Sequence, residues 1–142
     1  MKTMKYEYLD HTADLKIRAH GSNLEEAFVN TAVAAFDFLT DTSRVAKKLE
    51  KKVSIKANRV ESLLYDFLEE LLFMLDTDGL IVSEIKDLKI IQDKDEFSLQ
   101  CSALGDSYKN YEIKGNIKSV TYSEMKIEKT KDTYVIEVVL DI

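Results

Sequence analysis

The pattern of hydrophobic and polar positions along this chain predicts two amphipathic helices. Apolar residues recur every three or four positions over 24–39, and two overlapping capping-box patterns within 22–26 mark the start of that helix. A second apolar stripe covers 60–75 and is wider, so we expect the second helix to be the more buried one. Asn58 is its expected N-cap, and Gly79 is expected to end it in a left-handed conformation.

Polar and apolar residues alternate in much of the remaining chain, which predicts about seven β-strands. Two helices combined with mostly consecutive strands indicate an α+β domain, with the helices packed on a largely antiparallel sheet. The chain has 142 residues, so we expect 1–142 to form a single domain. The expected strands cover 4–9, 15–19, 53–57, 88–91, 97–99, stretches of 113–129, and 134–140.

Composition narrows the classes of function. The net charge of −6 argues against broad binding to a nucleic-acid backbone, and we expect no sequence-specific nucleic-acid binding. No apolar stretch approaches the roughly 18 residues that cross a membrane, and no signal peptide is evident, so we expect a cytoplasmic protein without a membrane partner. Cys101, the only cysteine, lies in an alternating strand and is interpreted as a core residue rather than a nucleophile.

The polar stretch from Asp10 to Asp14 lies between two predicted strands and holds two acids, a histidine and a threonine. Asp14 directly precedes a strand, so ordered backbone would fix its carboxylate as a ligand for a hard cation. The same residues also fit an ordinary turn, because Asp and Thr favour turn starts. His11 fits either a general base or a structural hydrogen-bonding residue. Spacing alone leaves these interpretations open.

The sequence closes on Leu140-Asp141-Ile142, directly after an apolar strand. The Asp141 side chain and the Ile142 α-carboxylate would then lie in one place, although a domain that simply stops at its last strand shows the same pattern. If Asp14 joins them, three carboxylates form a pocket suited to Ca²⁺, Mg²⁺ or Mn²⁺.

Lys118 lies in another alternating stretch, where it would pair with a buried acid, bind phosphate, or belong to a solvated face. The segment 76–79 hints at an EF-hand loop. With Gly79 at loop position six, however, Met74 and Ile85 would take positions one and twelve, which need oxygen ligands. No nucleotide-binding or hydrolase motif occurs, so we predict no catalytic residue and no organic cofactor.

Six blocks, in order from one end of the chain to the other, resemble the archease family. Each block alone is short, and their shared order makes the resemblance specific. The resemblance implies an archease-like α+β fold over the whole chain. The blocks are Asp10-His11-Thr12-Ala13-Asp14, residues 21–28, 39–42, 61–72 and 117–122, and Leu140-Asp141-Ile142.

The resemblance also implies a function, as the protein partner of the RtcB-type tRNA-splicing RNA ligase. Archeases promote guanylylation of that ligase, sustain its turnover and widen the nucleotides it accepts, without joining RNA themselves. The implied metal ligands are Asp14, Asp141 and the α-carboxylate of Ile142, with Ca²⁺ the expected ion and Mg²⁺ or Mn²⁺ as alternatives. The implied partner-facing residues are Lys118, His11 and Asp41.

This chain departs from the family in two places. Ser123 stands where many relatives have histidine, and no histidine occurs in 108–118, so the functions of those histidines do not carry over. Two other functions stay open. One is a stand-alone metal-dependent phosphoesterase with His11 or Asp10 as general base. The other is a chaperone-like binding module without metal chemistry.

Overall fold

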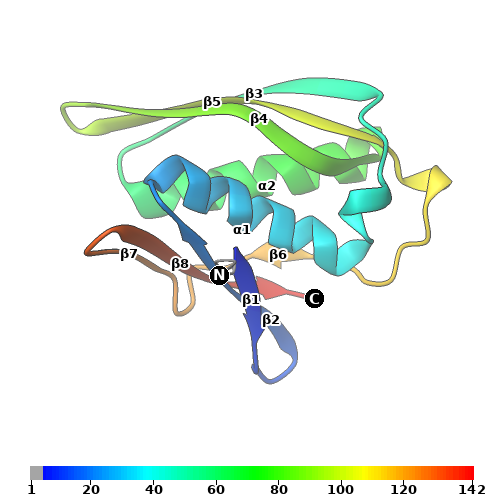
Figure 1. Cartoon of the computed structure of the whole chain (residues 1–142), viewed down its shortest axis with the longest axis horizontal. Coiled ribbons are helices and arrows are strands. Elements are labelled where there is room, and N and C mark those ends of the chain that lie inside the picture. The colour runs from blue at the N-terminus through cyan, green and yellow to red at the C-terminus, as the bar shows by residue number, and fades with distance from the viewer. Residues whose placement is uncertain (1–4) are drawn as a thin grey trace.

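The computed structural model describes residues 5–142, in which two helices lie between two antiparallel sheets (Figure 1). The five-stranded sheet contains β1 (Tyr6–Leu9), β2 (Asp14–Gly21), β6 (Ser119–Val120), β7 (Lys126–Thr130) and β8 (Thr133–Asp141). The three-stranded sheet contains β3 (Leu49–Ala57), β4 (Leu80–Asp93) and β5 (Glu96–Ser107). The helices are α1 (Leu24–Leu39), α2 (Val60–Asp78) and the short 3-10 helices η1 (Thr42–Arg44) and η2 (Tyr108–Asn110).

The predicted α+β class with antiparallel strands is confirmed, but the strands divide into two sheets rather than one. The strand order is β1-β2-β8-β6 in the larger sheet, with β7 also paired to β8, and β3-β5-β4 in the smaller one. Each sheet turns one face to the helices and the other to solvent (Figure 1). The core therefore lies between the helices and the inner faces of the two sheets. The outer face of each sheet is exposed to solvent.

α1 begins as its sequence predicts. The Asn23 side chain accepts a hydrogen bond from the backbone N–H of Glu26 at 2.8 Å, and the Glu26 carboxylate accepts one from the N–H of Ser22 at 3.1 Å. α1 contacts β2 and β8 of one sheet and β4 of the other. Nine of its residues are buried, against seven in α2. The prediction that the second helix is the more buried one is therefore wrong, because α2 keeps a solvent-exposed side that includes Phe73.

The start of α2 also differs from its prediction. Arg59, rather than Asn58, is the N-cap, and its side chain makes no capping hydrogen bond. Packing holds the helix in place instead, because Phe67 stacks on Phe28 of α1 with ring centroids 6.0 Å apart, and both rings are fully buried. The far end of α2 follows the prediction, since Gly79 adopts φ 70 and its N–H donates to the Leu75 carbonyl at 3.0 Å.

The segment 113–129 forms far less strand than its alternating sequence predicts. Only β6 and β7 within it pair, both with β8. The intervening backbone binds the ends of other elements instead. The N–H of Lys114 donates to the Leu39 carbonyl and the N–H of Lys118 to the Asp141 carbonyl, each at 2.7 Å. The segment thus connects the end of α1 to the end of β8.

Cys101 lies in β5 and is 6% exposed, which confirms the prediction of a core residue. Burial raises the pKa of its thiol to about 11, so it is a poor nucleophile near neutral pH. Within residues 5–142, no helix has the length and apolar character needed to span a membrane.

Candidate metal and partner-binding site

Two aspartates meet at one end of the five-stranded sheet. Asp14 is the first residue of β2 and Asp141 the last of β8, and the two are directly opposed in the antiparallel register. Side chains of directly opposed residues project from the same face, with Cβ atoms about 4.5–5.5 Å apart. Opposed like charges repel, at a cost of up to about 1 kcal/mol. The fold therefore places two carboxylates where a cation would relieve their repulsion.

The neighbouring strand and the final residue complete this end of the sheet. Ser119 of β6 opposes Asp141 on the side away from β2, and the Lys118 N–H donates to the Asp141 carbonyl. The Lys118 side chain is exposed. Ile142 is partly buried and packs against the hydrophobic core, which orders the backbone that follows Asp141. Lys118, Asp141 and Ile142 thus share one rim of the sheet with Asp14.

The turn before Asp14 has a conformation that is uncommon outside glycine. Ala13 has φ 63, in the left-handed region, which costs an L-residue about 1–2 kcal/mol. It joins β1 to β2 at the tip of their hairpin, and Asp10 and Thr12 in the same turn are exposed. The interpretation of this segment as a turn is thus correct, and the turn also delivers Asp14 to the head of its strand.

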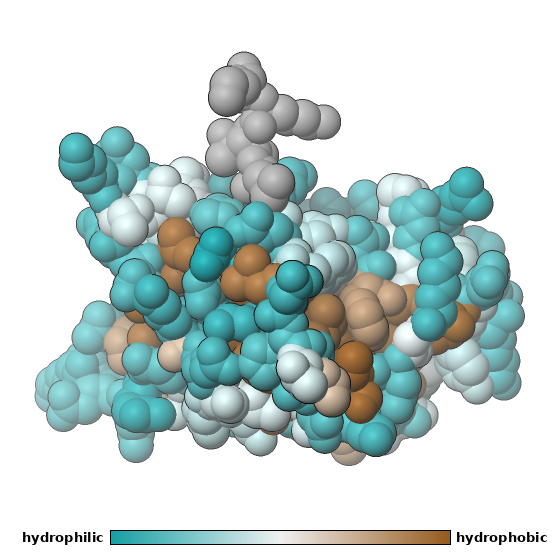
Figure 2. Space-filling model, turned by 90° about the horizontal axis from the view of Figure 1, so that it is seen from below, coloured by the Kyte–Doolittle hydropathy of each residue, from teal (hydrophilic) through white to brown (hydrophobic). Residues whose placement is uncertain are grey.

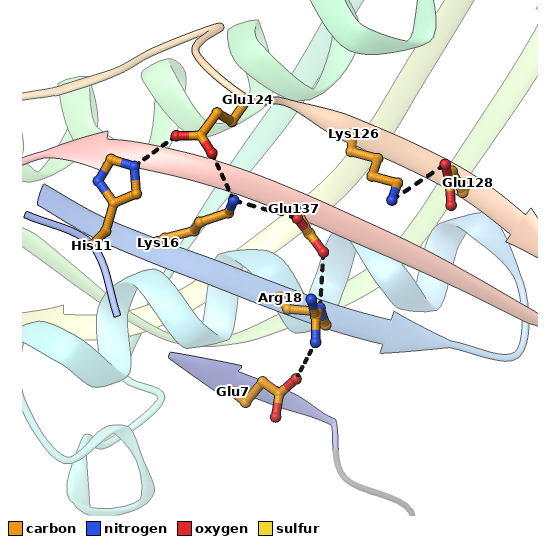
Figure 3. Close-up of polar contacts among 8 residues, drawn as sticks. All are labelled: Glu7, His11, Lys16, Arg18, Glu124, Lys126, Glu128 and Glu137. Carbon is orange, nitrogen blue, oxygen red and sulfur yellow. Dashed lines mark hydrogen bonds and ion pairs between the residues drawn. The ribbon is translucent and has the colours of Figure 1, made fainter. Parts of the chain in front are cut away.

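His11 bridges the hairpin tip and a turn that is distant in the sequence (Figure 3). Its Nε2 lies 2.7 Å from Oε2 of Glu124, a residue at a left-handed turn with φ 54. Its Nδ1 lies 3.4 Å from Oδ2 of Asp14, is shielded from solvent, and has no hydrogen-bond partner among the described residues. His11 therefore turns one nitrogen to Glu124 and the other toward the aspartate pair.

From Glu124 a row of alternating charges continues across the outer face of the same sheet (Figure 3). We call His11, Glu124, Lys16, Glu137, Arg18 and Glu7 the charge ladder. Lys16 Nζ lies 3.1 Å from Glu124 and 3.5 Å from Glu137. Arg18 lies 2.9 Å from Glu137 and 3.0 Å from Glu7. Seen from this side, hydrophilic residues surround scattered hydrophobic ones (Figure 2).

The ladder shifts the pKa values of its members. The hydrogen bonds from His11 and Lys16 hold the pKa of Glu124 below its ordinary value. Burial alone would raise the pKa of Glu137, but its hydrogen bond to Arg18 and the charges of Arg18 and Lys16 outweigh burial and lower it. Both glutamates are thereby kept ionised, so each cation of the ladder keeps its counter-charge.

Asp41 is separate from this arrangement. Its carboxylate accepts hydrogen bonds from the Ser43 hydroxyl at 2.6 Å and the Ser43 N–H at 3.1 Å, which caps η1 and lowers the pKa of Asp41. Arg44 lies 3.5 Å away. Among residues 5–142, no hydrogen bond or salt bridge joins Asp41 to either Asp14 or Asp141. Its contacts are local, and its partner-facing function stays a prediction.

The donor set suits a hard cation. Among the described residues, no three His, Cys, Asp or Glu side chains converge as a metal cage. The predicted set has only two such side chains, Asp14 and Asp141, because its third member is the α-carboxylate of Ile142. All three donors are carboxylate oxygens, which Ca²⁺, Mg²⁺ and Mn²⁺ prefer. Asp14 and Asp141 thus fit such an ion in chemistry and in strand register.

Sequence reasoning did not find Glu124, Lys16 and Glu137. Lys16 had a weak signal, because polar residues alternate along β2. Glu124 had none, since its partner His11 is 113 residues away along the chain.

The comparisons with known proteins bear on the whole chain. A family profile described as "Archease protein family (MTH1598/TM1083)" matches residues 6–142. The chain belongs to the archease family. This archease is 39% identical over 140 residues to "Protein archease" of Methanosarcina barkeri, covering 97% of this chain and 96% of the relative. It is also 39% identical over 130 residues to "Protein archease" of Pyrococcus furiosus, covering 90% and 91%.

Solved structures agree with the fold. The solution structure of Methanobacterium thermoautotrophicum protein 1598 superposes with a TM-score of 0.84 at 36% identity, covering 97% of this chain and 99% of that one. The crystal structure of an archease from Thermotoga maritima, described as a possible chaperone, gives a TM-score of 0.59 at 19% identity over all of both chains. The second likeness extends the shared fold to a distant sequence.

Proposed function

We propose that this archease activates an RtcB-type tRNA-splicing RNA ligase by promoting guanylylation of the ligase, so that the ligase turns over repeatedly. The observation that carries the proposal is the direct opposition of Asp14 and Asp141 at the rim of the sheet. We further propose that activation widens the nucleotides that the ligase accepts and takes place in the cytoplasm.

In this proposal the rim is the part that meets the ligase. Asp14, Asp141 and the α-carboxylate of Ile142 would hold a divalent cation through oxygen donors, with Ca²⁺ expected from the family resemblance and Mg²⁺ or Mn²⁺ as alternatives. When bound, such a cation stabilises negative charge that develops on a phosphate. Lys118 is exposed beside these residues and would neutralise a carboxylate or contact phosphate.

His11 would act by positioning rather than by catalysis. A general base needs a free nitrogen within reach of the proton it removes. The Nε2 of His11 is already 2.7 Å from Glu124, and its Nδ1 is shielded from solvent beside Asp14. This arrangement favours an accessory function over a phosphoesterase that works alone.

The direct test measures ligase turnover. The purified protein is mixed with the ligase, GTP and a cleaved RNA, and joined RNA is followed over several turnovers. We expect Asp14→Ala and Asp141→Ala to abolish activation, and Lys118→Ala to reduce it strongly. Asp95→Ala is the matched control, because Asp95 is an exposed acid in the turn between β4 and β5. Full activation by Asp14→Ala would contradict the proposal.

Calorimetry separates the metal from the partner. We expect Ca²⁺ to bind wild-type protein and the Asp95→Ala control equally, and Asp141→Ala not to bind it. If Ca²⁺, Mg²⁺ and Mn²⁺ all fail to bind while the ligase is still stabilised, the protein is a chaperone-like binding module. Phosphodiester hydrolysis by the protein alone would instead support the phosphoesterase.

A further inference from the structure

The outer surface of the three-stranded sheet carries a group of exposed lysines. The register places Lys52 of β3 and Lys86 of β4 on either side of Ser102, and Ser54 and Lys89 on either side of Gln100. We call Lys52, Lys86, Lys89, Ser54, Gln100 and Ser102 the lysine face. All except Ser102 are exposed. The helices separate this sheet from the five-stranded sheet, whose end that carries Asp14 and Asp141 we call the metal rim (Figure 1).

A β-bulge brings two of these lysines to the same face. Lys86 pairs with Ser102 and Lys89 with Gln100, so β4 advances three residues while β5 advances two. Residues three apart on a regular strand point to opposite faces, but the extra residue restores a common direction. Asp87 occupies the bulge with φ 56. Because of the bulge, Lys86 and Lys89 lie on the same face of the sheet although they are three residues apart.

Lys52 is the one lysine of this face with partners among residues 5–142, and its Nζ donates a hydrogen bond to Oγ of Ser102 at 2.9 Å. Lys52 lies 3.0 Å from Glu50, but the side chains of this pair are 80% and 47% exposed, which makes it a weak surface pair. Lys86 and Lys89 form no salt bridge with any residue of 5–142. Asp87 is the one acid lining the depression of about 400 Å³ at the centre of the face, within the described part of the chain. Three lysines against the two acids Asp87 and Glu50 leave a small local excess of positive charge on a protein of net charge −6.

We propose that the lysine face binds the sugar–phosphate backbone of double-helical RNA without reading its sequence. Lysine, serine and glutamine are side chains that contact phosphate and sugar oxygens in nucleic-acid complexes. Gln100 and Ser54 also suit the 2′-hydroxyls displayed in the wide minor groove of an RNA duplex. This inference concerns a surface remote from the metal rim and is independent of the proposed ligase activation.

The side chains of the lysine face suit an RNA duplex better than a single strand or a protein partner. Single strands are held by stacking of bases on aromatic side chains, and the lysine face has no aromatic member. Protein partners use apolar or aromatic anchors at the centre of an interface, whereas the centre here is Ser54, Gln100 and Ser102. Ile91, which is 62% exposed in the next row of the sheet, is the apolar anchor that a protein partner would use.

The test uses the protein alone, with fluorescence anisotropy of a labelled RNA hairpin whose stem has about 16 base pairs. The face variant is Lys52→Gln/Lys86→Gln/Lys89→Gln. The matched control is Lys109→Gln/Lys126→Gln/Lys131→Gln, which removes the same charge from exposed lysines elsewhere. We expect the face variant to bind about tenfold or more weakly and to lower the slope of log affinity against log salt by about 3, with little change in the control.

Four outcomes would overturn the inference. They are no binding by wild type at low salt, equal loss in the face and control variants, equal binding of a DNA duplex, and stronger binding of polyglutamate that Ile91→Ser abolishes. The last two would assign the face to general polyanions or to an acidic protein. Thermal unfolding by circular dichroism shows whether the triple variant is folded. If it is not, Lys89→Gln alone should lower the slope by about 1.

Discussion

The outer face of the five-stranded sheet pairs its charges, whereas the outer face of the three-stranded sheet leaves Lys86 and Lys89 without a salt bridge to any residue of 5–142. In the charge ladder, Lys16 and Glu137 lie 3.5 Å apart with side chains only 14% and 12% exposed. On the lysine face, Lys86 and Lys89 are exposed and form no salt bridge within residues 5–142. A charge that is shielded from solvent and paired contributes to the stability of the fold, because removal of its partner leaves a partly buried charge without compensation. A charge that is exposed and unpaired is available to another molecule.

The two faces also differ in what arranges them. The ladder uses the regular register of β2 and β8, where Arg18 directly opposes Glu137. The lysine face depends on irregular backbone, since β4 has register shifts between Val82 and Glu84 and again between Lys86 and Lys89. We therefore expect side-chain changes to disturb the first face and backbone changes to disturb the second.

The largest effect is expected from Gly105→Ala, beside the first register shift. A Cβ at this position would lie 1.8 Å from the carbonyl oxygen of Ile81, which is backbone and cannot turn aside. We expect a loss of about 3 kcal/mol or more in the free energy of unfolding, measured by urea denaturation. Gly115→Ala is the control, because its Cβ would meet only the side-chain ring of Phe38. We expect this variant to lose about 1 kcal/mol in the free energy of unfolding. Equal stability of Gly105→Ala and wild type would show that backbone irregularity does not fix the lysine face.

The next effect concerns the centre of the ladder. Glu137→Ala leaves Arg18 and Lys16 without their shared carboxylate, and we expect unfolding free energy to fall by about 2 kcal/mol. Glu128→Ala removes a carboxylate 3.4 Å from Lys126, in a pair whose side chains are 48% and 52% exposed, and should cost at most about 0.5 kcal/mol. The same urea titration measures both. Similar losses of unfolding free energy in the two variants would mean that the ion pairs of the charge ladder stabilise the fold no more than an exposed surface pair does.

A smaller effect is expected from pH. The lowered pKa of Glu137 means that the native state favours its carboxylate, so the unfolded state binds more protons as pH falls. The stabilisation is present above the ordinary value of 4.5 and is lost as pH drops through the lowered pKa. Unfolding free energies measured from about pH 6 to about pH 2.5 should fall more steeply for wild type than for Glu137→Gln. Parallel curves would assign the acid sensitivity to other carboxylates.

The sequence was a good guide to the two helices and to most of the strands, and a poor one to the segment 113–129 and to how the strands pair. Residues 24–39 have strong periodicity and a local cap at Asn23, so local chemistry alone places this helix. Alternation over 113–129 suggested strands, but a strand needs a partner, and here the backbone of Lys114 bonds to the end of α1. The division into two sheets was equally hidden, because pairing between distant strands leaves no local mark.

The candidate site divides in the same way. Asp14 and Asp141 were singled out because acids stand at the ends of apolar strands, and their register then placed them together. Glu124 could not be found, because its contact with His11 depends on a left-handed turn far along the chain. The net charge of −6 is a sum over the chain, so it does not show that a bulge gathers Lys86 and Lys89 on one face.

The smallest effect on the free energy of unfolding is expected from removing two unpaired lysines of the lysine face. Lys86→Gln/Lys89→Gln removes two charges that have no salt-bridge partner among residues 5–142, so nothing is stranded by their loss. We expect the free energy of unfolding to stay within about 0.5 kcal/mol of wild type, since surface changes away from caps, cores and pairs rarely exceed that. Urea denaturation at low salt checks this under conditions where surface charge matters most. A loss of about 1 kcal/mol or more would show that these lysines serve the fold, and the contrast between the two faces would then disappear.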